Sequence, residues 1–356
     1  MDKLFNKVQF FIFRGKVYSL KNKNQKHRIM KVLFVSSGNR KQGLNPIIHL
    51  QALSLEKVGV EIEHFLIFGN GFWGYFKNVL RLRKHLNENQ FDLVHAHFGF
   101  SCVVAQIAKG KSPLVVTLMG TDMLGHKNED GTISFKNRLV LWINHYFGNH
   151  LYESAIVMNE KMKGVLSKRK KPTYILSNGV DTELFFEVPK REALEFLGWE
   201  SGVHHFIFIS NPQRPEKNFA LANDAVEFLK REGYQVRLHA VFQEKSENLK
   251  YYYSAATALV LSSFHEGSPN VIKEAFCCNC PIVSTDVGDV AITTSGLSGC
   301  FITTYEVSEF ADSLKKAINF STEYGRISGR QRIQEMEFDS QTVALKIKKI
   351  YQDKIE

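Results

Sequence analysis

The sequence predicts an α/β fold made of two doubly wound parallel sheets. Short apolar runs alternate with helical patterns along most of the 356 residues, and this alternation is typical of βαβ units. The series is interrupted once, by the charge-rich segment 168–181, and then starts again. The length also favours two domains. Two such domains leave a cleft between them, where ligands usually bind.

The first series predicts an N-terminal domain over residues 29–170. Each short apolar run indicates a buried strand, and each longer run with a 3.6-residue period indicates a helix. The predicted strands cover 31–37, 60–68, 91–98, 113–120 and 154–159, and the predicted helices cover 46–58, 75–86, 101–109 and 134–150. The strands of a βαβ series run parallel, so their carboxyl ends meet at one edge of the sheet.

The second series predicts another α/β domain over residues 171–338. Its elements follow from the same two patterns. The predicted strands cover 204–210, 235–242, 256–263, 281–288 and 299–304, and the predicted helices cover 217–231, 269–278 and 306–319. One more helical pattern covers 339–354.

Residues 1–28 form a basic N-terminal segment. The segment holds eight Lys and Arg but one acid, Asp2, and its charges alternate with apolar side chains. This mixture favours an anionic membrane surface as partner; a disordered basic tail is the alternative. The net charge of +10 also suits nucleic acid, but the sequence has no nucleic-acid motif and no pattern of stacking aromatic residues.

Two further observations bear on location and metal content. No apolar run approaches the ~20 residues of a membrane-spanning helix, and 8–13 is too short for a secretory signal, so we expect a cytoplasmic protein. The five cysteines, three of them within 277–280, do not form a disulfide framework. No second Cys/His pair stands at zinc-ligand spacing.

The stretch "HEGSPNVIKEAF" (265–276) carries two carboxylates, Glu266 and Glu274, at a strand–loop–helix junction. We expect Ser268 to be the N-cap of the helix and Pro269 to take its first position. A helix N-terminus attracts anions, and carboxylates accept hydrogen bonds from hydroxyls. An anion between groups of hydroxyls describes a nucleotide-sugar.

A loop with two cations, Arg214 and Lys217, follows the first strand of the second domain. In a cleft, the two cations could hold a diphosphate. Arg214 would bind it with its fork of donors, and Lys217 would act as a point charge. An exposed basic loop is the alternative.

Three places in the first domain lie at the predicted carboxyl edge. Gly43 lets backbone approach a ligand or serves as a turn glycine. Asp122, in "MGTD" (119–122) with Gly120, accepts a hydrogen bond from an acceptor hydroxyl or caps a helix. His95 and His97 point to one face of a strand; His97 is the candidate for the cleft, and a core histidine is the alternative.

These motifs together resemble the retaining glycosyltransferases of family four, which have the GT-B architecture of two Rossmann-like domains. "EGSPNVIKEAFCCNCPIVSTDVGDV" resembles the signature of that family, and "RPEK" resembles its phosphate-binding loop. "VHAHFG", "MGTD" and "SNGVD" are similar to its further landmarks. The resemblance covers about residues 30–350.

The resemblance implies a role for each candidate residue. Glu274 would bind the ribose, Glu266 would contact the donor hexose, and Arg214 with Lys217 would hold the diphosphate. Backbone amides near the donor would come from Gly267, Ser268, Pro269, Asn270 and Val271. Gly43 would add a donor contact, and Gly120, Asp122 and His97 would lie on the acceptor side. The last helix, within 339–356, would cross back onto the first domain.

The sequence also departs from the family pattern. Met119 stands where many relatives have a histidine, so any role of that histidine is absent or moved. Asn279 replaces a glycine, which is structurally mild because Asn tolerates a left-handed helix cap. Gly43 is single where relatives often have a pair.

We therefore predict a retaining hexosyltransferase that moves a hexose from a UDP- or GDP-sugar to a hydroxyl of a lipid-linked or polysaccharide acceptor. It would lie on the inner face of the cytoplasmic membrane. No metal or other cofactor is expected, because no DxD-like pair stands at a suitable place. The resemblance implies a front-face mechanism in which the leaving phosphate takes the acceptor proton. The alternatives are a nucleotide-sugar epimerase of the same fold and a basic nucleic-acid-binding protein.

Overall fold

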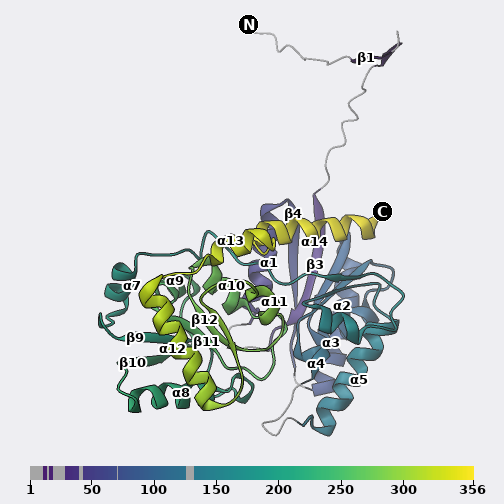
Figure 1. The fold of residues 1–356 in the computed structure, drawn as a ribbon. Helices are drawn as coiled ribbons and strands as arrows, with labels where there is room; N and C mark the ends of the chain where they lie inside the picture. The colour runs from purple at the N-terminus through teal and green to yellow at the C-terminus, as the bar shows by residue number, and fades with distance from the viewer. Residues whose placement is uncertain (1–10, 14–15, 19–28, 40–42, 70, 126–131) are drawn as a thin grey trace.

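The computed structural model describes residues 11–13, 16–18, 29–39, 43–69, 71–125 and 132–356. It consists of two α/β domains side by side (Figure 1). Two short strands of the basic segment, β1 (Phe11–Phe13) and β2 (Lys16–Tyr18), pair antiparallel. The other residues of the segment 1–28, and with them most of the predicted membrane anchor, lie outside the described residues.

The first domain has a parallel sheet of six strands in the order β4-β3-β5-β6-β7-β8. The strands are β3 (Met30–Ser37), β4 (Val60–Ile67), β5 (Leu93–His97), β6 (Leu114–Leu118), β7 (Ser154–Val157) and β8 (Thr173–Ile175). Every residue of β5, β6 and β7 is buried. Strands covered on both faces are apolar throughout, which is why the sequence shows these runs so clearly.

The helices of the first domain are α1 (Pro46–Lys57), α2 (Gly71–Glu88), α3 (Gly99–Ala108), α4 (Thr121–Leu124), α5 (Phe135–His150) and α6 (Glu160–Val165). Polar side chains start three of them. Asn45, Ser134 and Asn159 each accept a hydrogen bond from a first-turn amide, which satisfies a backbone donor that the helix leaves free.

The second domain has a parallel sheet of five strands in the order β10-β9-β11-β12-β13. The strands are β9 (His204–Phe208), β10 (Val236–Ala240), β11 (Ala258–Leu261), β12 (Ile282–Thr285) and β13 (Cys300–Thr303). Alternate side chains face two separate cores: Ile207 and Leu259 lie in one, Phe206 and Val260 in the other. The sheet is therefore doubly wound, as predicted.

Helices cover both faces of this second sheet. They are α7 (Lys190–Leu197), α8 (Phe219–Arg231), α9 (Ser246–Ala255), α10 (Asn270–Cys277), α11 (Val290–Thr294), α12 (Val307–Glu323) and α13 (Gly329–Glu335), with a 3-10 turn, η1, at Pro215–Lys217. The apolar faces of α8 and α12 pack on one side, and those of α10 and α13 pack on the other.

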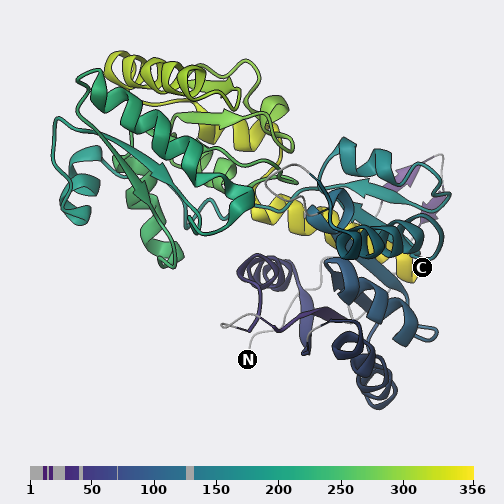
Figure 2. The same ribbon diagram turned by 90° about the horizontal axis from the view of Figure 1, so that it is seen from below.

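The last helix, α14 (Ser340–Ile355), runs from the second domain onto the first (Figure 2). Val343, Ile347 and Tyr351 belong to the core of the first domain. The Tyr351 hydroxyl and the His95 Nδ1 are 2.5 Å apart, so a polar contact joins this helix to β5. The helix ties the end of the chain to the domain in which the chain began.

The chain passes between the domains at two places that lie side by side. Val180 donates its amide to the Phe338 carbonyl (2.9 Å), and Ser340 donates to the Val180 carbonyl (2.9 Å). A Cβ on Gly179 would come 2.6 Å from the Ser340 Cα, so this close crossing requires glycine. The first sheet continues to Ile175 in β8, past the junction predicted at residue 170, because the apolar run after the charged turn pairs with β7.

Candidate active site

The two-glutamate motif lies at the predicted strand–loop–helix junction, with Glu266 in the loop after β11 and Glu274 within α10. Its cap differs from the prediction. Helix α10 begins at Asn270, with Pro269 in the N-cap position and no side-chain cap. The Ser268 hydroxyl is buried and makes no hydrogen bond to the first turn of α10. Burial raises the pKa of the nearby Asp289 carboxyl, and Lys273 and Ser268 oppose that rise. Pro269 has ψ of 121°, an extended value that places it before the first helical residue.

Lys217 and Glu266 form the central ion pair of the site. The Lys217 Nζ donates to Glu266 Oε1 at 2.5 Å, and both side chains are largely buried. The Ser263 hydroxyl donates to the same carboxylate oxygen at 2.8 Å. Arg214 donates to Glu216 Oε1 through Nε at 2.8 Å and is half exposed. The two predicted phosphate ligands therefore lie on one loop, but in different surroundings.

Backbone contacts fix this loop against the end of β11. The Phe264 amide donates to the Glu216 carbonyl at 3.0 Å. The Ser262 hydroxyl donates to the Asn218 carbonyl at 2.7 Å, and Asn218 takes a left-handed conformation with φ of 50°. The position of Lys217 relative to Glu266 is thus set by main-chain bonds and does not depend on the ion pair alone.

A cavity of about 110 Å³ next to this pair is lined by both domains. The second domain contributes Arg214, Glu216, Lys217, His265, Glu266 and Gly267, and the first contributes Phe98, Met119, Gly120, Thr121 and Leu124. Gly120 and Gly267 meet at its wall: a Cβ on Gly267 would lie 2.6 Å from the Met119 carbonyl oxygen. The structure therefore brings the "MGTD" loop to the first glutamate, as the acceptor-side prediction requires.

Asn159 makes a hydrogen bond across this junction. Its Nδ2 donates to the Gly267 carbonyl at 2.6 Å, while its Oδ1 caps α6. Asn159 was not among the residues predicted for the site. A polar residue directly after a buried strand at the carboxyl edge is the signal that marks it.

Glu274 faces a second interdomain cavity, of about 90 Å³. The Tyr253 hydroxyl donates to its Oε2 at 2.7 Å. Burial raises the pKa of Glu274, and the hydrogen bond from Tyr253 and the charge of Lys273 oppose that rise. Asn270 lines the same cavity, as do residues of α1, α14 and the crossing segment 178–181. The two glutamates thus serve neighbouring cavities on either side of the α10 N-terminus.

Lys273 is buried beside Glu274 and was not among the residues predicted for the site. Its Nζ donates to the Asn178 carbonyl at 2.8 Å and lies 5.1 Å from the centre of the Phe338 ring. Burial lowers its pKa to about 8, although Asp289 and Glu274 act to raise it. The sequence feature that marks Lys273 is its position on the apolar face of a predicted helix. Lys273 connects α10 to the crossing between the domains.

Asp122 supports the backbone of the acceptor side. Its carboxylate accepts hydrogen bonds from the amides of Gly120 (2.8 Å), Met119 (3.1 Å) and Gly99 (3.1 Å). Burial raises its pKa, and these amide bonds oppose the rise. The carboxylate therefore holds the "MGTD" loop against the start of α3. It does not cap the next helix, because Asp122 lies within α4, whose N-cap residue is Gly120.

His97 is a core residue and lines neither of these two cavities. Its ring packs 4.5 Å from the Phe34 ring and 4.0 Å from the His95 ring, between centres. Burial holds its pKa well below the usual value. The prediction for the cleft is therefore wrong, and His97 lies in the core because β5 is covered on both faces. It is not a satisfied core histidine, since neither ring nitrogen has a hydrogen-bond partner among the described residues. Gly43 has φ of +73° and is likewise not among the lining residues.

The described residues show neither a metal-ion cluster nor a membrane-spanning helix. They hold no cluster of three or more His, Cys, Asp or Glu side chains arranged to bind a metal ion. No helix within them has the length and apolar character needed to cross a membrane. The five cysteines are unpaired, and Cys300 alone of them is more than slightly exposed.

Two family models match the two domains of the chain. The profile described as Glycosyltransferase Family 4 matches residues 32–184, and the profile described as Glycosyl transferases group 1 matches residues 205–319. TuaC of Bacillus subtilis (strain 168), a glycosyltransferase named for teichuronic acid biosynthesis, is 28% identical over 228 residues. That alignment covers 56% of this chain and 54% of TuaC, so the chain matches about half the length of this relative.

Solved structures share the fold. The sucrose-phosphate synthase of Thermosynechococcus elongatus has a TM-score of 0.72 at 15% identity, over 91% of this chain and 98% of its own. Anabaena HepE, solved with UDP and glucose, has a TM-score of 0.69 at 18% identity, over 91% of this chain and 99% of its own. The two profiles and the shared fold lead to one conclusion: the chain belongs to the glycosyltransferases of family 4 and group 1 and has the GT-B fold.

Proposed function

We propose that this glycosyltransferase moves a hexose from a UDP- or GDP-sugar to a hydroxyl of a lipid-linked or polysaccharide acceptor, with retention of configuration. The observation that carries the proposal is the Lys217–Glu266 pair at a cavity shared by both domains. It places a cation and a carboxylate where a diphosphate and a sugar hydroxyl can meet.

The donor would span the two cavities around the N-terminus of α10. The free amides at this end of the helix favour an anion, so the diphosphate would lie there, within reach of Lys217 and Arg214. The ribose would lie toward Glu274, where Tyr253 occupies one carboxylate oxygen and the other is available to a hydroxyl. The hexose would lie toward Glu266 and Gly120.

The reaction would use the residues present as follows. The bond from the anomeric carbon to the diphosphate oxygen breaks, and a bond to the acceptor oxygen forms on the same face. The acceptor proton passes to the leaving phosphate. Lys217 and Arg214 stabilise the negative charge that grows on the diphosphate, and such charge stabilisation is usually the largest catalytic contribution. These two cations supply the positive charge that a metal ion would otherwise supply, so we propose a metal-independent reaction.

The comparisons support the donor and acceptor classes by analogy. HepE has been solved with UDP-glucose, and the name of TuaC refers to a surface polysaccharide. We extend both to this chain as a proposal: a nucleotide-sugar donor and a glycan acceptor carried by a lipid or a polysaccharide. Such an acceptor places the enzyme at the cytoplasmic face of the membrane, with residues 1–28 as one means of attachment.

A thermal-shift screen against UDP-, GDP- and ADP-sugars tests the donor. We expect one nucleotide class to raise the melting temperature, and no shift with any of them would contradict the proposal. Incubating the donor that binds without acceptor and following its sugar by NMR separates the alternatives. A transferase releases free hexose slowly, whereas an epimerase converts the sugar while it remains attached to the nucleotide.

A further inference from the structure

Helix α2 exposes a row of apolar side chains on one side. Trp73, Phe76 and Leu80 follow one another at intervals of three and four residues, so they share a helical face. Trp73 is 71% exposed and Leu80 is 69% exposed, and the Trp73 and Phe76 rings are in edge contact. Buried Val79 and Leu82 hold the other side of the helix in the core. We call Trp73, Phe76 and Leu80 the α2 row.

Helix α5 exposes a second row, longer than the first. Phe135, Leu139, Trp142 and Tyr146 lie at intervals of four, three and four residues. Phe135 is 84% exposed and Trp142 is 63% exposed, and the Trp142 and Tyr146 rings stack at 5.9 Å between centres. We call these four residues the α5 row.

An apolar groove of about 210 Å³ joins the two rows. Its lining comes from three helices: Tyr75, Phe76 and Val79 of α2, Phe100, Val103, Val104 and Ile107 of α3, and Ile143 and Phe147 of α5. All nine are apolar or aromatic. The α2 row enters the groove through Phe76, and the α5 row lies beside Ile143 and Phe147 on the same helix. The rows and the groove form one surface, the α2–α5 face.

The α2–α5 face carries positive charge. Helices α2, α3 and α5 contain six Lys and Arg (Lys77, Arg81, Arg83, Lys84, Lys136 and Arg138) against one acid, Glu88. Lys77, Arg81 and Lys84 follow the α2 row around the helix, on the side away from the groove. An apolar centre with aromatic residues and a basic rim is complementary to a bilayer that contains anionic lipid.

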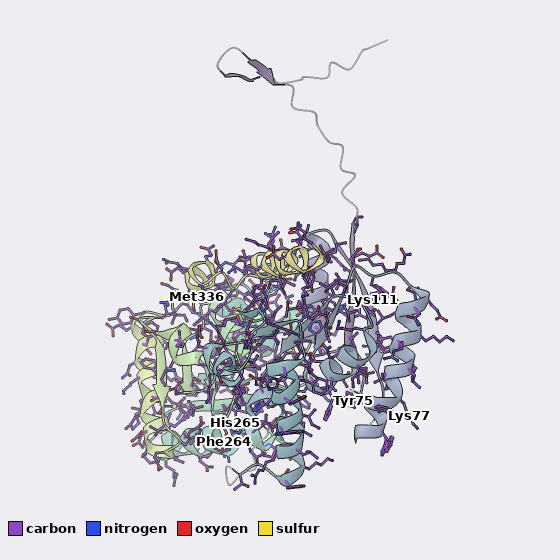
Figure 3. All side chains as sticks on the ribbon, turned by 90° about the vertical axis from the view of Figure 1, so that its right-hand side faces the viewer. Tyr75, Lys77, Lys111, Phe264, His265 and Met336 are labelled. Atoms are coloured by element: carbon purple, nitrogen blue, oxygen red, sulfur yellow. The ribbon has the colours of Figure 1, made fainter. Side chains whose placement is uncertain are left out.

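The face also borders the active site. Helix α2 follows β4 and helix α5 leads into β7, so both begin on the carboxyl side of their parallel sheet. In Figure 3, Tyr75 and Lys77 at the start of α2 lie toward the same lower edge of the molecule as Phe264 and His265, whereas Lys111, before β6, lies toward the upper edge. Trp73 and Phe135 stand in the first turns of their helices, so they lie near the cleft.

A third cavity lies between the groove and the cleft. It has a volume of about 180 Å³ and lies between α2, α3, α4 and α5. It shares Tyr75 and Phe100 with the groove, and Phe98 and Thr121 with the cavity at Lys217 and Glu266. Neighbouring cavities therefore lie between the outer apolar surface and the proposed reaction centre.

We propose that the α2–α5 face docks on an anionic lipid bilayer, with the two rows in the interfacial region and the groove against the hydrocarbon. Docked in this way, the enzyme has the mouth of its acceptor cavity at the membrane surface. This orientation rests on the proposed function in one respect: the acceptor is lipid-linked, so its head group enters through the cavity beside Tyr75 and Phe98.

Quenching of tryptophan fluorescence tests the contact directly in the full chain. The three tryptophans are Trp73 and Trp142 on the face and Trp199 in the second domain; residues 1–28 contain none. Vesicles of phosphatidylcholine and phosphatidylglycerol with brominated acyl chains should quench the wild type. They should not quench the Trp73→Phe/Trp142→Phe variant. Wild-type fluorescence that brominated lipid leaves unchanged would overturn the proposal, even if the protein sedimented with the vesicles.

Co-sedimentation with the same vesicles tests the contribution to affinity. The Leu139→Ser/Trp142→Ser variant should bind about tenfold more weakly than the wild type, equivalent to about 1.4 kcal/mol. The matched control is Ile292→Ser/Tyr324→Ser, two side chains of the second domain that are 67% and 65% exposed, and it should bind like the wild type. Equal binding by all three proteins would refute the proposal.

Two measurements separate this inference from the proposed function and from self-association. Donor binding by calorimetry should be the same in the Leu139→Ser/Trp142→Ser variant and the wild type, so failure of donor binding in both would count against the transferase alone. Sedimentation velocity without lipid should give a monomer. A wild-type dimer that the Leu139→Ser/Trp142→Ser variant loses would assign the face to a second copy of the chain and overturn membrane docking.

Discussion

Replacing Lys217 with Met should reduce turnover far more than replacing Arg214 with Met. Both residues were predicted as ligands of the diphosphate, but the structure gives them different surroundings. The side chain of Lys217 is 17% exposed and pairs with Glu266, whereas that of Arg214 is 53% exposed and pairs with its neighbour Glu216. Solvent therefore screens the charge of Arg214 much more strongly.

The exposures set the expected magnitudes. At 4 Å, a cation stabilises an anion by ~4 kcal/mol at the effective dielectric of a partly buried site, and by ~1 kcal/mol in water. The first value is an upper bound of about 1,000-fold in rate and the second corresponds to about fivefold. Part of the attraction already exists in the bound donor, so we expect a loss of about 100-fold for Lys217→Met and less than about tenfold for Arg214→Met.

The assay is steady-state turnover of the donor identified by the thermal-shift screen, measured as nucleotide release with and without acceptor. Both variants should lower kcat more than they raise the apparent KM, because the charge on the leaving diphosphate grows in the transition state. Lys230→Met is the matched control, since Lys230 forms an exposed ion pair with Glu227; it should keep wild-type kcat.

Two results would contradict this reasoning. If Arg214→Met were the more damaging variant, exposure would not be the factor that ranks the two cations. If Lys217→Met kept wild-type kcat in a folded protein, Lys217 would have no role at the leaving group, and its contact with Glu266 would be structural.

Four further predictions follow from the same structure. Glu274→Ala should weaken donor binding about tenfold or more without unfolding the protein, because it removes a hydrogen-bonded carboxylate; unchanged affinity by calorimetry would dismiss the ribose assignment. Burial lowers the pKa of Lys273 from 10.5 to about 8. Between pH 8 and 10.5 the unfolded chain therefore keeps a proton on Lys273 that the folded chain has lost, so the free energy of unfolding of the wild type should rise with pH in this range. In denaturant titrations from pH 8 to 10.5, the free energy of unfolding of the wild type should increase by up to about 3 kcal/mol relative to that of Lys273→Met. The same pH dependence in both proteins would show that folding does not lower the pKa of Lys273. Activity should survive EDTA; a complete loss that Mg²⁺ or Mn²⁺ restores would disprove metal independence. Deleting residues 1–28 should weaken sedimentation with anionic vesicles in a salt-dependent way, since each Lys or Arg near such a surface contributes ~1 kcal/mol; equal binding by both proteins would assign attachment to the α2–α5 face alone.

Much of the fold and part of the site were predictable from local patterns. The buried strands β5, β6 and β11 appear as apolar runs, because parallel strands between two layers of helices have no polar face. The motif at Glu266 and Glu274 and the loop at Lys217 appear at strand ends, where chain direction alone places them at the carboxyl edge. The charged turn before β8 hid a strand of three residues, because a run that short has no periodicity to detect.

Tertiary contacts decided the features that depend on partners distant in the sequence. Ser268 is buried and does not cap α10, and Pro269 takes the N-cap position with no side-chain cap. His97 alternates with His95 on a strand whose two faces are both covered, so it is a core residue. The partner of Lys273 is a carbonyl 95 residues away. A local sequence pattern does not predict such long-range contacts.

Helix α5 shows most clearly what the sequence determines and what packing determines. By its sequence, residues 135–150 form a helix with apolar side chains on most of its circumference, and nothing in that pattern distinguishes the inner side from the outer. Packing makes the choice: Asn144 and Gly148 face the domain, and Trp142 and Tyr146 face outward. The sequence alone determines which strands are buried and which residues stand at the strand ends, because both features depend on neighbours along the chain. Which side of such a helix faces solvent depends on the elements that pack against it, and only the tertiary structure shows which elements these are.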